Sequence, residues 1–215
     1  MGSRWLRERR ADPYYKRAKR EHYASRAAYK LMQIDNRFRL IYPGNVVLDL
    51  GAAPGGWTQV AAERSQPGGL VIAVDMRPAA VGRGAVAIRG EVSSPHTLDK
   101  IRAALASHGK AKADVVVSDM SPSISGIYGI DHARSADLVV KAMEICDLLL
   151  RPKGRFAAKV FEGEMMSSVI EKAERRFGTV KLFSPDASRD RSSEIYLVGK
   201  GFRGGQVSCP SGSRA

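Results

Sequence analysis

The stretch VVLDLGAAPGGW, residues 46–57, decides the fold of this chain. Four apolar residues and one aspartate predict a buried strand, and the turn after it contains Gly51, Gly55 and Gly56. Glycine lets backbone N–H groups come close to a ligand, and a helix predicted at residues 58–64 presents its positive end at the same place. Strand, turn and helix in this order predict a site for a nucleotide-like cofactor.

An acidic residue farther along supports the same interpretation. Asp75 follows the next apolar run, residues 70–74. It lies about 20 residues beyond the turn, where a carboxylate can bind ribose hydroxyls. A turn that serves packing alone is the alternative. The combination of strand, turn, helix and acid in the right order favours the cofactor site.

Length and composition predict one domain over residues 1–215, because the chain is long enough for one core and no Ser/Gly/Pro-rich linker divides it. It has no run of about 20 apolar residues and no apolar signal segment, so we expect neither a membrane span nor an export signal, and a cytoplasmic location. Cys146 and Cys209 are too few for a disulfide framework. The four histidines lack the spacing of ligands, so we expect no metal.

Positive charge is concentrated near the N-terminus. The formal net charge is +13, and residues 1–40 hold twelve basic and four acidic groups. Aromatic residues lie among the basic ones: Trp5, Tyr14, Tyr15, Tyr23 and Tyr29. This mixture suits phosphate neutralisation and base stacking, and predicts a nucleic-acid-binding extension. A solvated face or a disordered tail is the alternative for residues 1–12, whereas apolar positions at helical spacing predict that the later part folds.

Beyond the basic region, apolar β-rich runs alternate with helical patterns. Strands are predicted at residues 46–50, 70–74, 85–89, 115–118 and 155–161, and helices at 97–107, 135–150 and 164–177. Pro152 and Gly154 are predicted to end the helix at 135–150. The Gly/Ser-rich tail, residues 203–215, is expected to be disordered.

This alternation predicts an α/β fold with a mostly parallel sheet covered on both faces. Two final strands, residues 180–183 and 195–199, have no helix between them, which predicts an antiparallel hairpin at the end of a seven-stranded sheet. This is the order of Rossmann-like methyltransferases. Ligands of such sheets bind outside the carboxyl ends of the strands. One crevice should therefore contain the glycine turn, Asp75, Glu91, Asp119 and Lys159.

The composition of the turn indicates which cofactor it binds. It reads GAAPGG, with Pro54 inside it, instead of the G-x-G-x-x-G of NAD enzymes. It resembles the turn that binds S-adenosylmethionine. Glu91, after the third strand, is a candidate for contact with adenine or, alternatively, a solvated loop acid.

Residues after the fourth strand indicate the atom that receives the methyl group. An amino-nitrogen methylase is expected to carry Asp or Asn followed by Pro-Pro-aromatic there, whereas this chain has Asp119 followed by Met-Ser-Pro. A carbon-5 cytosine enzyme needs a cysteine nucleophile, and neither cysteine is placed for that role. Oxygen remains as the favoured acceptor.

A ribose 2′-hydroxyl is a weak nucleophile and needs a base that has lost its own proton. Burial or a second ammonium favours the neutral form of a lysine. Lys159 lies in the apolar strand sequence AAKVFEG, and Lys30 in RAAYKL would supply the second ammonium. Asp119 and Glu194 are carboxylates that could orient the two lysines. A strand lysine that extends to the surface is the alternative for Lys159.

Taken together, these motifs resemble the FtsJ-type ribosomal RNA ribose 2′-O-methyltransferases, from about residue 23 to residue 202. The segments that carry the resemblance are VVLDLGAAPGGW, VIAVDM, DVVVSDMSP, GRFAAKVFEG and PDASRDRSSEIYLV, with SRAAYKL upstream. The resemblance implies a catalytic set of Lys30, Asp119, Lys159 and Glu194, in which Lys159 activates the hydroxyl. It implies S-adenosylmethionine contacts at Gly55, Trp57, Asp75, Glu91 and Asp119, to which the turn adds Gly51 and Gly56. Bacterial members usually have Asp where Glu91 stands.

The same resemblance implies an RNA substrate. Large-subunit ribosomal RNA, methylated on a uridine, is favoured, and the partner is this RNA or the large ribosomal subunit. Methylation of a transfer RNA anticodon loop is one alternative, and a catalytically inactive RNA-binding assembly protein is another. Residues 1–40 then form an RNA-binding extension. Neither a metal nor a membrane is implied, and we expect a monomer.

Overall fold

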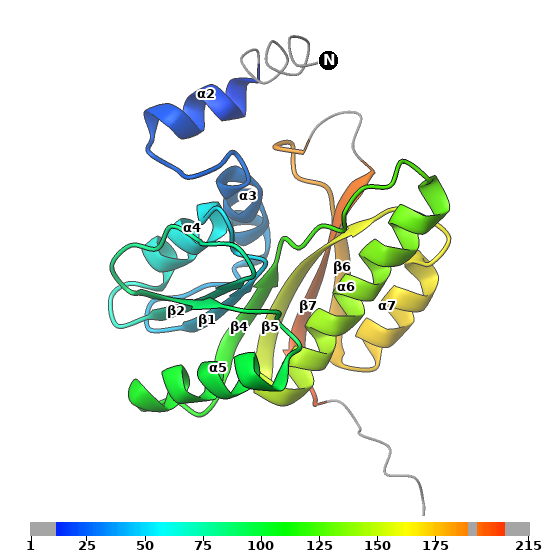
Figure 1. Cartoon of the computed structure of the whole chain (residues 1–215). Helices are drawn as coiled ribbons and strands as arrows, with labels where there is room; N and C mark the ends of the chain where they lie inside the picture. Colours follow the sequence, from blue (N-terminus) through cyan, green and yellow to red (C-terminus); the bar gives the residue numbers. More distant parts are fainter. Residues whose placement is uncertain (1–11, 189–192, 205–215) are drawn as a thin grey trace, which may run out of the picture.

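A seven-stranded sheet forms the centre of the computed structural model, which describes residues 12–188 and 193–204 (Figure 1). The strands lie in the order β3-β2-β1-β4-β5-β7-β6. Their bounds are β1 Val46–Leu50, β2 Leu70–Asp75, β3 Ala85–Arg89, β4 Ala113–Ser118, β5 Leu150–Phe161, β6 Phe177–Phe183 and β7 Glu194–Phe202. Strands β1 to β5 pair in parallel, whereas β7 is antiparallel to both β5 and β6. The predicted Rossmann-like fold is confirmed, and the structure adds that β7 inserts between β5 and β6.

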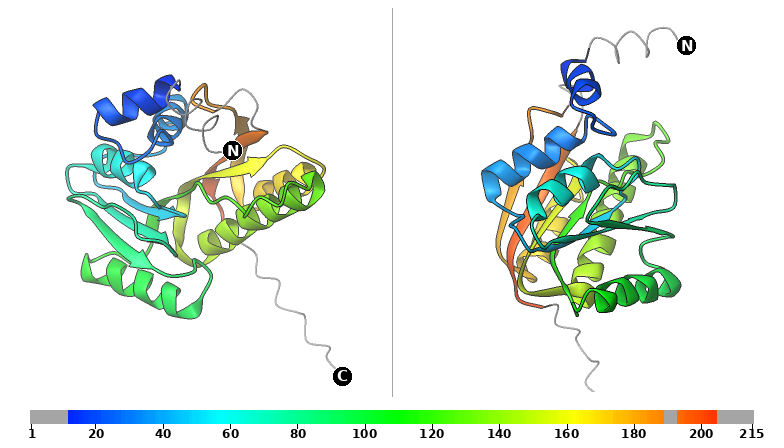
Figure 2. Two further views of the ribbon diagram at one scale, coloured as in Figure 1. Left: turned by 45° about the horizontal axis from the view of Figure 1, so that its top comes forward. Right: turned by 90° about the vertical axis from the view of Figure 1, so that its left-hand side faces the viewer.

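Helices cover both faces of the sheet (Figures 1 and 2). One face carries α3 Ala28–Phe38 and α4 Gly56–Ser65; the other carries α5 Pro95–Ser107, α6 Tyr128–Leu149 and α7 Met166–Glu174. Alternate residues of β1 reach opposite faces, since Leu48 packs in the cluster with α5 to α7 and Val47 in the cluster with α3 and α4. This three-layer arrangement brings the carboxyl ends of the parallel strands to one edge.

The basic N-terminal region includes a folded helix, α2 Pro13–Arg20. Asp12 accepts a hydrogen bond from the Tyr15 N–H and Pro13 occupies the first turn, which are two common features of a helix start. Ala18 is buried in a small cluster with Tyr29. The predicted extension therefore has ordered structure from residue 12, whereas residues 1–11, and residues 205–215 of the predicted tail, lie outside the described residues.

Helix α6 begins at Tyr128, and the predicted start at residue 135 was therefore wrong. Its early buried positions are Asp131, His132 and Ser135, which are polar. An apolar periodicity cannot detect a helix face of this kind.

The predicted helix at residues 164–177 was also too long, because Phe177 begins β6. The ring of Phe177 stacks on Phe156 of β5, with centroids 5.4 Å apart. Strand β5 starts directly after α6, and its register with β4 shifts after Leu150. Pro152 and Gly154 consequently lie in the irregular first part of β5 and do not form a separate segment that ends the helix.

Candidate active site

The turn after β1 depends on glycine for conformational and steric reasons. Gly51 and Gly55 have φ angles of +75° and +119°. A Cβ atom at Gly51 would lie 2.5 Å from the Cγ of Met120, and one at Gly55 would lie 2.3 Å from the carbonyl oxygen of Ala80. Substitution is therefore strained at both positions. The space beside each of these two Cα atoms is filled by the chain itself.

Gly56 has a different neighbour. A Cβ atom there would lie 2.4 Å from the Oγ of Ser25, so this glycine permits close packing of α4 against the segment before α3. Within the described residues no side chain caps α4, and its first N–H groups and positive end are therefore available to an anionic or polar ligand. Contact of Gly51, Gly55 and Gly56 with the cofactor stays a prediction. Because glycine has no side chain, backbone N–H groups would have to make these contacts.

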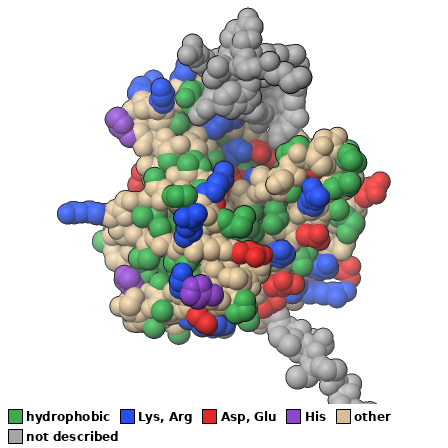
Figure 3. Space-filling model, viewed as in Figure 1, with side chains coloured by type: hydrophobic (Ala, Val, Ile, Leu, Met, Phe, Trp, Pro, Cys, Tyr) green, Lys and Arg blue, Asp and Glu red, His purple; other side chains and the backbone are tan. Residues whose placement is uncertain are grey.

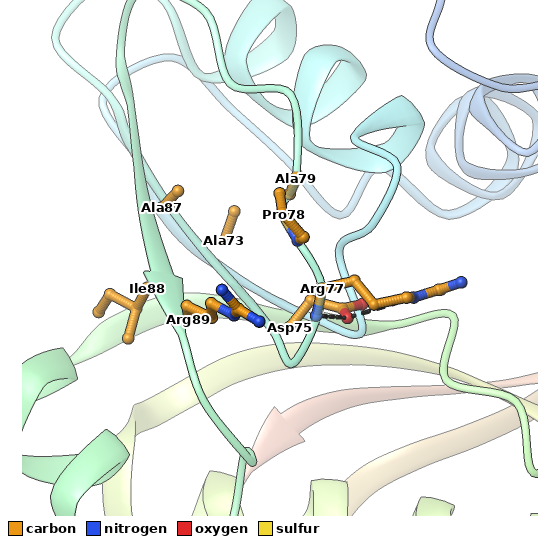
Figure 4. A pocket seen from close by; sticks show the side chains of 8 residues that line it. All are labelled: Ala73, Asp75, Arg77, Pro78, Ala79, Ala87, Ile88 and Arg89. Carbon is orange, nitrogen blue, oxygen red and sulfur yellow. Dashed lines mark hydrogen bonds and ion pairs between the residues drawn. The ribbon is translucent and has the colours of Figure 1, made fainter.

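Asp75 ends β2 and ties this strand to the turn. Its Oδ2 accepts a hydrogen bond from the Ala53 N–H at 2.9 Å, and its Oδ1 accepts one from the Arg77 N–H at 2.7 Å. A cavity of about 210 Å³ lies beside it (Figure 4). Asp75 lies between Arg77 and Arg89 in this view. Because pockets for whole small molecules typically measure about 300 to 1,000 Å³, this one suits only part of a cofactor.

Two other predicted cofactor residues occupy less direct positions. The Trp57 side chain is 2% exposed, and its Nε1–H donates to the carbonyl oxygen of Ala27 at 2.8 Å. Its indole thus packs inside the protein, and only its backbone at the start of α4 faces the turn. The side chain of Glu91 is 59% exposed and accepts from the Ser93 hydroxyl; Glu91 does not line the cavity. Contact of either residue with the cofactor stays a prediction.

The predicted catalytic residues form two ion pairs at the carboxyl edge of the sheet. Lys159 of β5 donates to the backbone oxygen of Asp119 at 2.9 Å and lies 3.1 Å from its Oδ1. Lys30 of α3 pairs with the carboxylate of Glu194 at the start of β7. The four side chains are between 6% and 18% exposed. The structure therefore brings together residues that are up to 164 positions apart in the chain.

Tyr196 links these two pairs and was missed by the sequence analysis. It is fully buried, lies opposite Lys159 in the β5–β7 register, and donates a hydrogen bond to Asp119 Oδ1 at 3.0 Å. Its ring faces the ammonium of Lys30, whose Nζ is 5.9 Å from the ring centroid. Alternation along a strand puts Tyr196 on the same face as Glu194, and this signal could have identified it.

Asp49 was also missed. It is fully buried in β1, and its Oδ2 accepts a hydrogen bond from the Thr58 hydroxyl at 2.7 Å, whereas its Oδ1 has no partner within the described part of the chain. Burial raises the pKa of this carboxyl to about 7, with smaller contributions from the charges of Asp119 and Asp75. The Asp49–Thr58 bond joins the central strand to α4 directly below the cofactor turn.

Residues 23–202 match the FtsJ-like methyltransferase family. The chain belongs to this family. The match confirms the predicted reaction class and the predicted use of S-adenosylmethionine. It spans every element from α3 to β7 and thus the whole site described above.

Individual relatives agree with the family assignment. The chain is 46% identical over 209 residues to "Ribosomal RNA large subunit methyltransferase E" of Methanothermobacter thermautotrophicus, covering 95% of this chain and 96% of the relative. A protein of the same name from Marinobacter nauticus is 45% identical over 201 residues, covering 94% and 96%.

Solved structures show the same architecture. A crystal structure described as a putative ribosomal RNA methyltransferase from Plasmodium falciparum has a TM-score of 0.76 and 26% identity, covering 85% of this chain and all of that one. Aeropyrum pernix fibrillarin, solved with natively bound S-adenosyl-L-methionine, has a TM-score of 0.55 at 17% identity, covering 80% of this chain and 73% of that one. This second likeness shows the fold alone.

No group of His, Cys, Asp and Glu in residues 12–188 and 193–204 has the arrangement of a metal site. Cys146 is a free, buried thiol, and Cys209 lies outside these ranges. No helix in the same ranges has both the length and the apolar character needed to cross a bilayer.

Proposed function

We propose that this methyltransferase modifies the 2′-hydroxyl of a uridine ribose in large-subunit ribosomal RNA. The pairing of Lys159 with Asp119 and of Lys30 with Glu194, linked through Tyr196 beside the cofactor turn, is the observation that supports this most strongly. Two lysines and two carboxylates at the carboxyl edge of the sheet, where the cofactor turn also lies, suit deprotonation of a hydroxyl and positioning of its sugar.

The cofactor fits the residues on this edge. The uncapped start of α4 would receive its carboxylate end, and Asp75 would receive its ribose by exchanging one of its two backbone hydrogen bonds. S-adenosylmethionine supplies a methyl group on a positively charged sulfur, which is a good leaving group. The protein therefore has mainly to position and deprotonate the acceptor.

Lys159 would accept the proton of the 2′-hydroxyl. Its contacts with the backbone oxygen and carboxylate of Asp119 fix the direction of the amine. Tyr196 donates its hydroxyl hydrogen bond to the same carboxylate oxygen, Oδ1, that Lys159 contacts. Lys30 and Glu194 would fix the ribose next to Lys159, with the Lys30 ammonium able to contact the adjacent phosphate. The proton then leaves Lys159 to solvent after transfer.

The choice of RNA is supported by the relatives and by charge. Both relatives described above are named as large-subunit ribosomal RNA methyltransferases. Helix α2 places Arg17, Lys19 and Arg20 in its last turn, on the same edge of the molecule as the site (Figure 1). These residues would contact phosphates. We therefore propose residues 12–40 as part of an RNA-binding extension within a single domain, in a protein that acts as a monomer on cytoplasmic ribosomal particles.

A methyl-transfer assay tests the proposal. The protein is incubated with S-adenosylmethionine labelled in the methyl group and, separately, with unmodified large ribosomal subunits, their extracted RNA and total transfer RNA. The proposal predicts label in an alkali-resistant linkage of large-subunit RNA. Label on a base would refute the 2′-oxygen, and label on transfer RNA alone would establish the anticodon-loop alternative. No transfer to any RNA by a protein that binds the cofactor would support the inactive assembly protein.

A further inference from the structure

The loop between β4 and α6 concentrates exposed apolar side chains. Ile124, Ile127, Tyr128 and Ile130 are 66%, 58%, 65% and 41% exposed. In the described part of the chain, four of the ten large hydrophobic side chains classed as exposed thus lie within seven residues. Hydrophobic side chains gather over the start of α6 in Figure 3. We call residues 124–130 the α6-start surface. A concentration of this kind marks a contact with another molecule.

Aromatic rings connect this surface to the catalytic strand. The ring of Tyr128 packs against that of His132 in a tilted arrangement, with centroids 3.8 Å apart and planes 32° apart. His132 is 6% exposed, and its ring centroid lies 5.8 Å from that of Phe161. Phe161 ends β5, two residues after Lys159. One face of the Tyr128 ring therefore packs against His132, which in turn packs against Phe161. The Tyr128 side chain as a whole remains largely open to solvent.

Neighbouring residues fix the positions of the Tyr128 and His132 rings. The Tyr128 hydroxyl donates to the carbonyl oxygen of Glu162 at 3.3 Å. A Cβ atom at Gly163 would lie 2.2 Å from the Nδ1 of His132, so the histidine ring needs a glycine beside it. The Tyr128 ring is thus held at its hydroxyl and along one face. A rigid ring loses little entropy when it binds a ligand.

The loop itself is held by one carboxylate. Asp131 accepts hydrogen bonds from the Ser125 N–H at 2.8 Å, from the Ser125 hydroxyl at 2.7 Å and from the Gly126 N–H at 3.0 Å. The bond from the Ser125 N–H is the largest cause that lowers the pKa of this carboxyl. Ile127 and Tyr128 therefore follow a loop that is braced before any ligand binds.

We infer that the exposed face of Tyr128 is a stacking platform for an RNA base close to the nucleotide that is methylated. The inference rests on the proposed function, because it uses the position of Lys159 on the same strand end. Helix α2 and the start of α6 lie on opposite sides of the carboxyl edge (Figures 1 and 2). A strand of RNA that contacts both would pass over Lys159. The net charge of +13 favours RNA over a protein partner for this surface.

Binding measurements separate stacking from charge. The full chain is titrated with a uridine dodecamer and with polyphosphate, which has the charge but no bases. Loss of one base–aromatic stack weakens binding about tenfold. Tyr128→Ala should therefore weaken binding of the dodecamer by about this factor and leave polyphosphate unchanged, whereas Tyr128→Trp should bind the dodecamer at least as well as the parent.

Tyr128→Leu is the matched control, since it keeps an apolar side chain and removes the ring. The inference predicts that it behaves like Tyr128→Ala. If Tyr128→Leu bound the dodecamer as tightly as the parent, or if Tyr128→Ala did, the platform would be refuted, and the surface would be an apolar contact for a protein. Gly163→Ala, which displaces His132 under the platform, should weaken binding less than Tyr128→Ala does.

Kinetics give a second readout. In the transfer assay, Tyr128→Ala should raise the KM for RNA about tenfold and change kcat less than about twofold. An unchanged KM would contradict the inference. If the parent protein transferred no methyl to RNA, the proposed function would fail by itself, while the difference between the dodecamer and polyphosphate would still decide whether Tyr128 stacks on bases.

Discussion

The two halves of the site are built from different parts of the chain. The cofactor half, the turn at residues 51–56 with Asp75, consists mainly of backbone, and its shape depends on glycine φ angles and on N–H groups that bind Val74 and Asp75. The catalytic half consists of side chains from α3, β5, β7 and the end of β4. Changes in the first half should therefore act on folding and cofactor affinity, and changes in the second on turnover.

The largest expected effect is that of Lys159→Met in the catalytic half. Loss of a general base typically lowers kcat about 10²- to 10⁴-fold. The Kd for the cofactor should change less than about threefold, because Asp119, the predicted cofactor residue that Lys159 contacts, keeps its hydrogen bond from Tyr196. Single-turnover rates and calorimetric titration measure the two quantities. Lys181→Met, at an exposed strand lysine, is the control and should retain activity. A parallel loss of kcat and cofactor affinity in Lys159→Met would remove the distinction between the two halves.

The next effect concerns stability below the cofactor turn. The carboxyl of Asp49 has a pKa of about 7 in the folded protein, against about 4 in an unfolded chain. Between these values the folded state binds more protons, so Asp49 makes the free energy of unfolding fall as pH rises from about 4 to about 7. Asp49→Asn keeps an acceptor for Thr58 and removes this dependence.

The stability of Asp49→Asn relative to the parent should therefore increase by about 4 kcal/mol between pH 4 and pH 8. Urea unfolding at a series of pH values, without cofactor, measures this difference. Groups common to both proteins cancel in the comparison. A difference in unfolding free energy that stays constant over this range would show that Asp49 is already ionised in the folded protein at low pH.

Gly55→Ala tests the backbone-built half. Its φ of +119° and the close carbonyl oxygen of Ala80 oppose a side chain. A side chain in such a conformation costs about 1 to 3 kcal/mol. We expect a loss of unfolding free energy of this size and weaker cofactor binding, with a smaller change of kcat at saturating cofactor. Gly82→Ala is the control, since no atom lies within 4 Å of its added Cβ and its φ is ordinary. Equal effects at the two glycines would contradict the steric argument.

Tyr196→Phe should have the smallest effect. It removes the hydroxyl that donates to Asp119 and keeps the buried ring. A hydrogen bond to a charged group contributes about 1.5 kcal/mol at the low end of its range, which corresponds to about a tenfold fall in kcat. Cofactor affinity should not change. Tyr42→Phe, at an exposed ring, serves as the control. An unaltered kcat would show that Asp119 needs no support from Tyr196.

The parts of the fold with regular apolar patterns were predictable. The strand Val46–Leu50 is buried along its whole length and is apolar except for Asp49. The acids and the lysine at strand ends could be assigned to one edge from the parallel topology. The start of α6 was not predictable, because Asp131 and His132 replace apolar residues on its buried face. The insertion of β7 between β5 and β6 depends on long-range pairing, which local patterns do not report.

The candidate site was predicted residue by residue but not contact by contact. Lys30 and Glu194 form a pair only because α3 packs against the start of β7, and nothing in either segment specifies this partner. Trp57 was predicted as a cofactor contact, but its side chain packs against Tyr196 inside the protein, with ring centroids 5.6 Å apart. Motif position thus identified the residue, while burial decides which of its atoms can reach a ligand.

The central claim is that Lys159 acts on the ribose hydroxyl. A crystal structure of the protein with S-adenosylhomocysteine and an RNA fragment containing the methylated nucleotide tests it most directly. The account predicts that Lys159 Nζ lies about 2.6 to 3.2 Å from the 2′-oxygen, with Asp119 still in contact with the amine. It would be contradicted if the 2′-oxygen were bound by another basic group and Lys159 Nζ pointed away from the ribose.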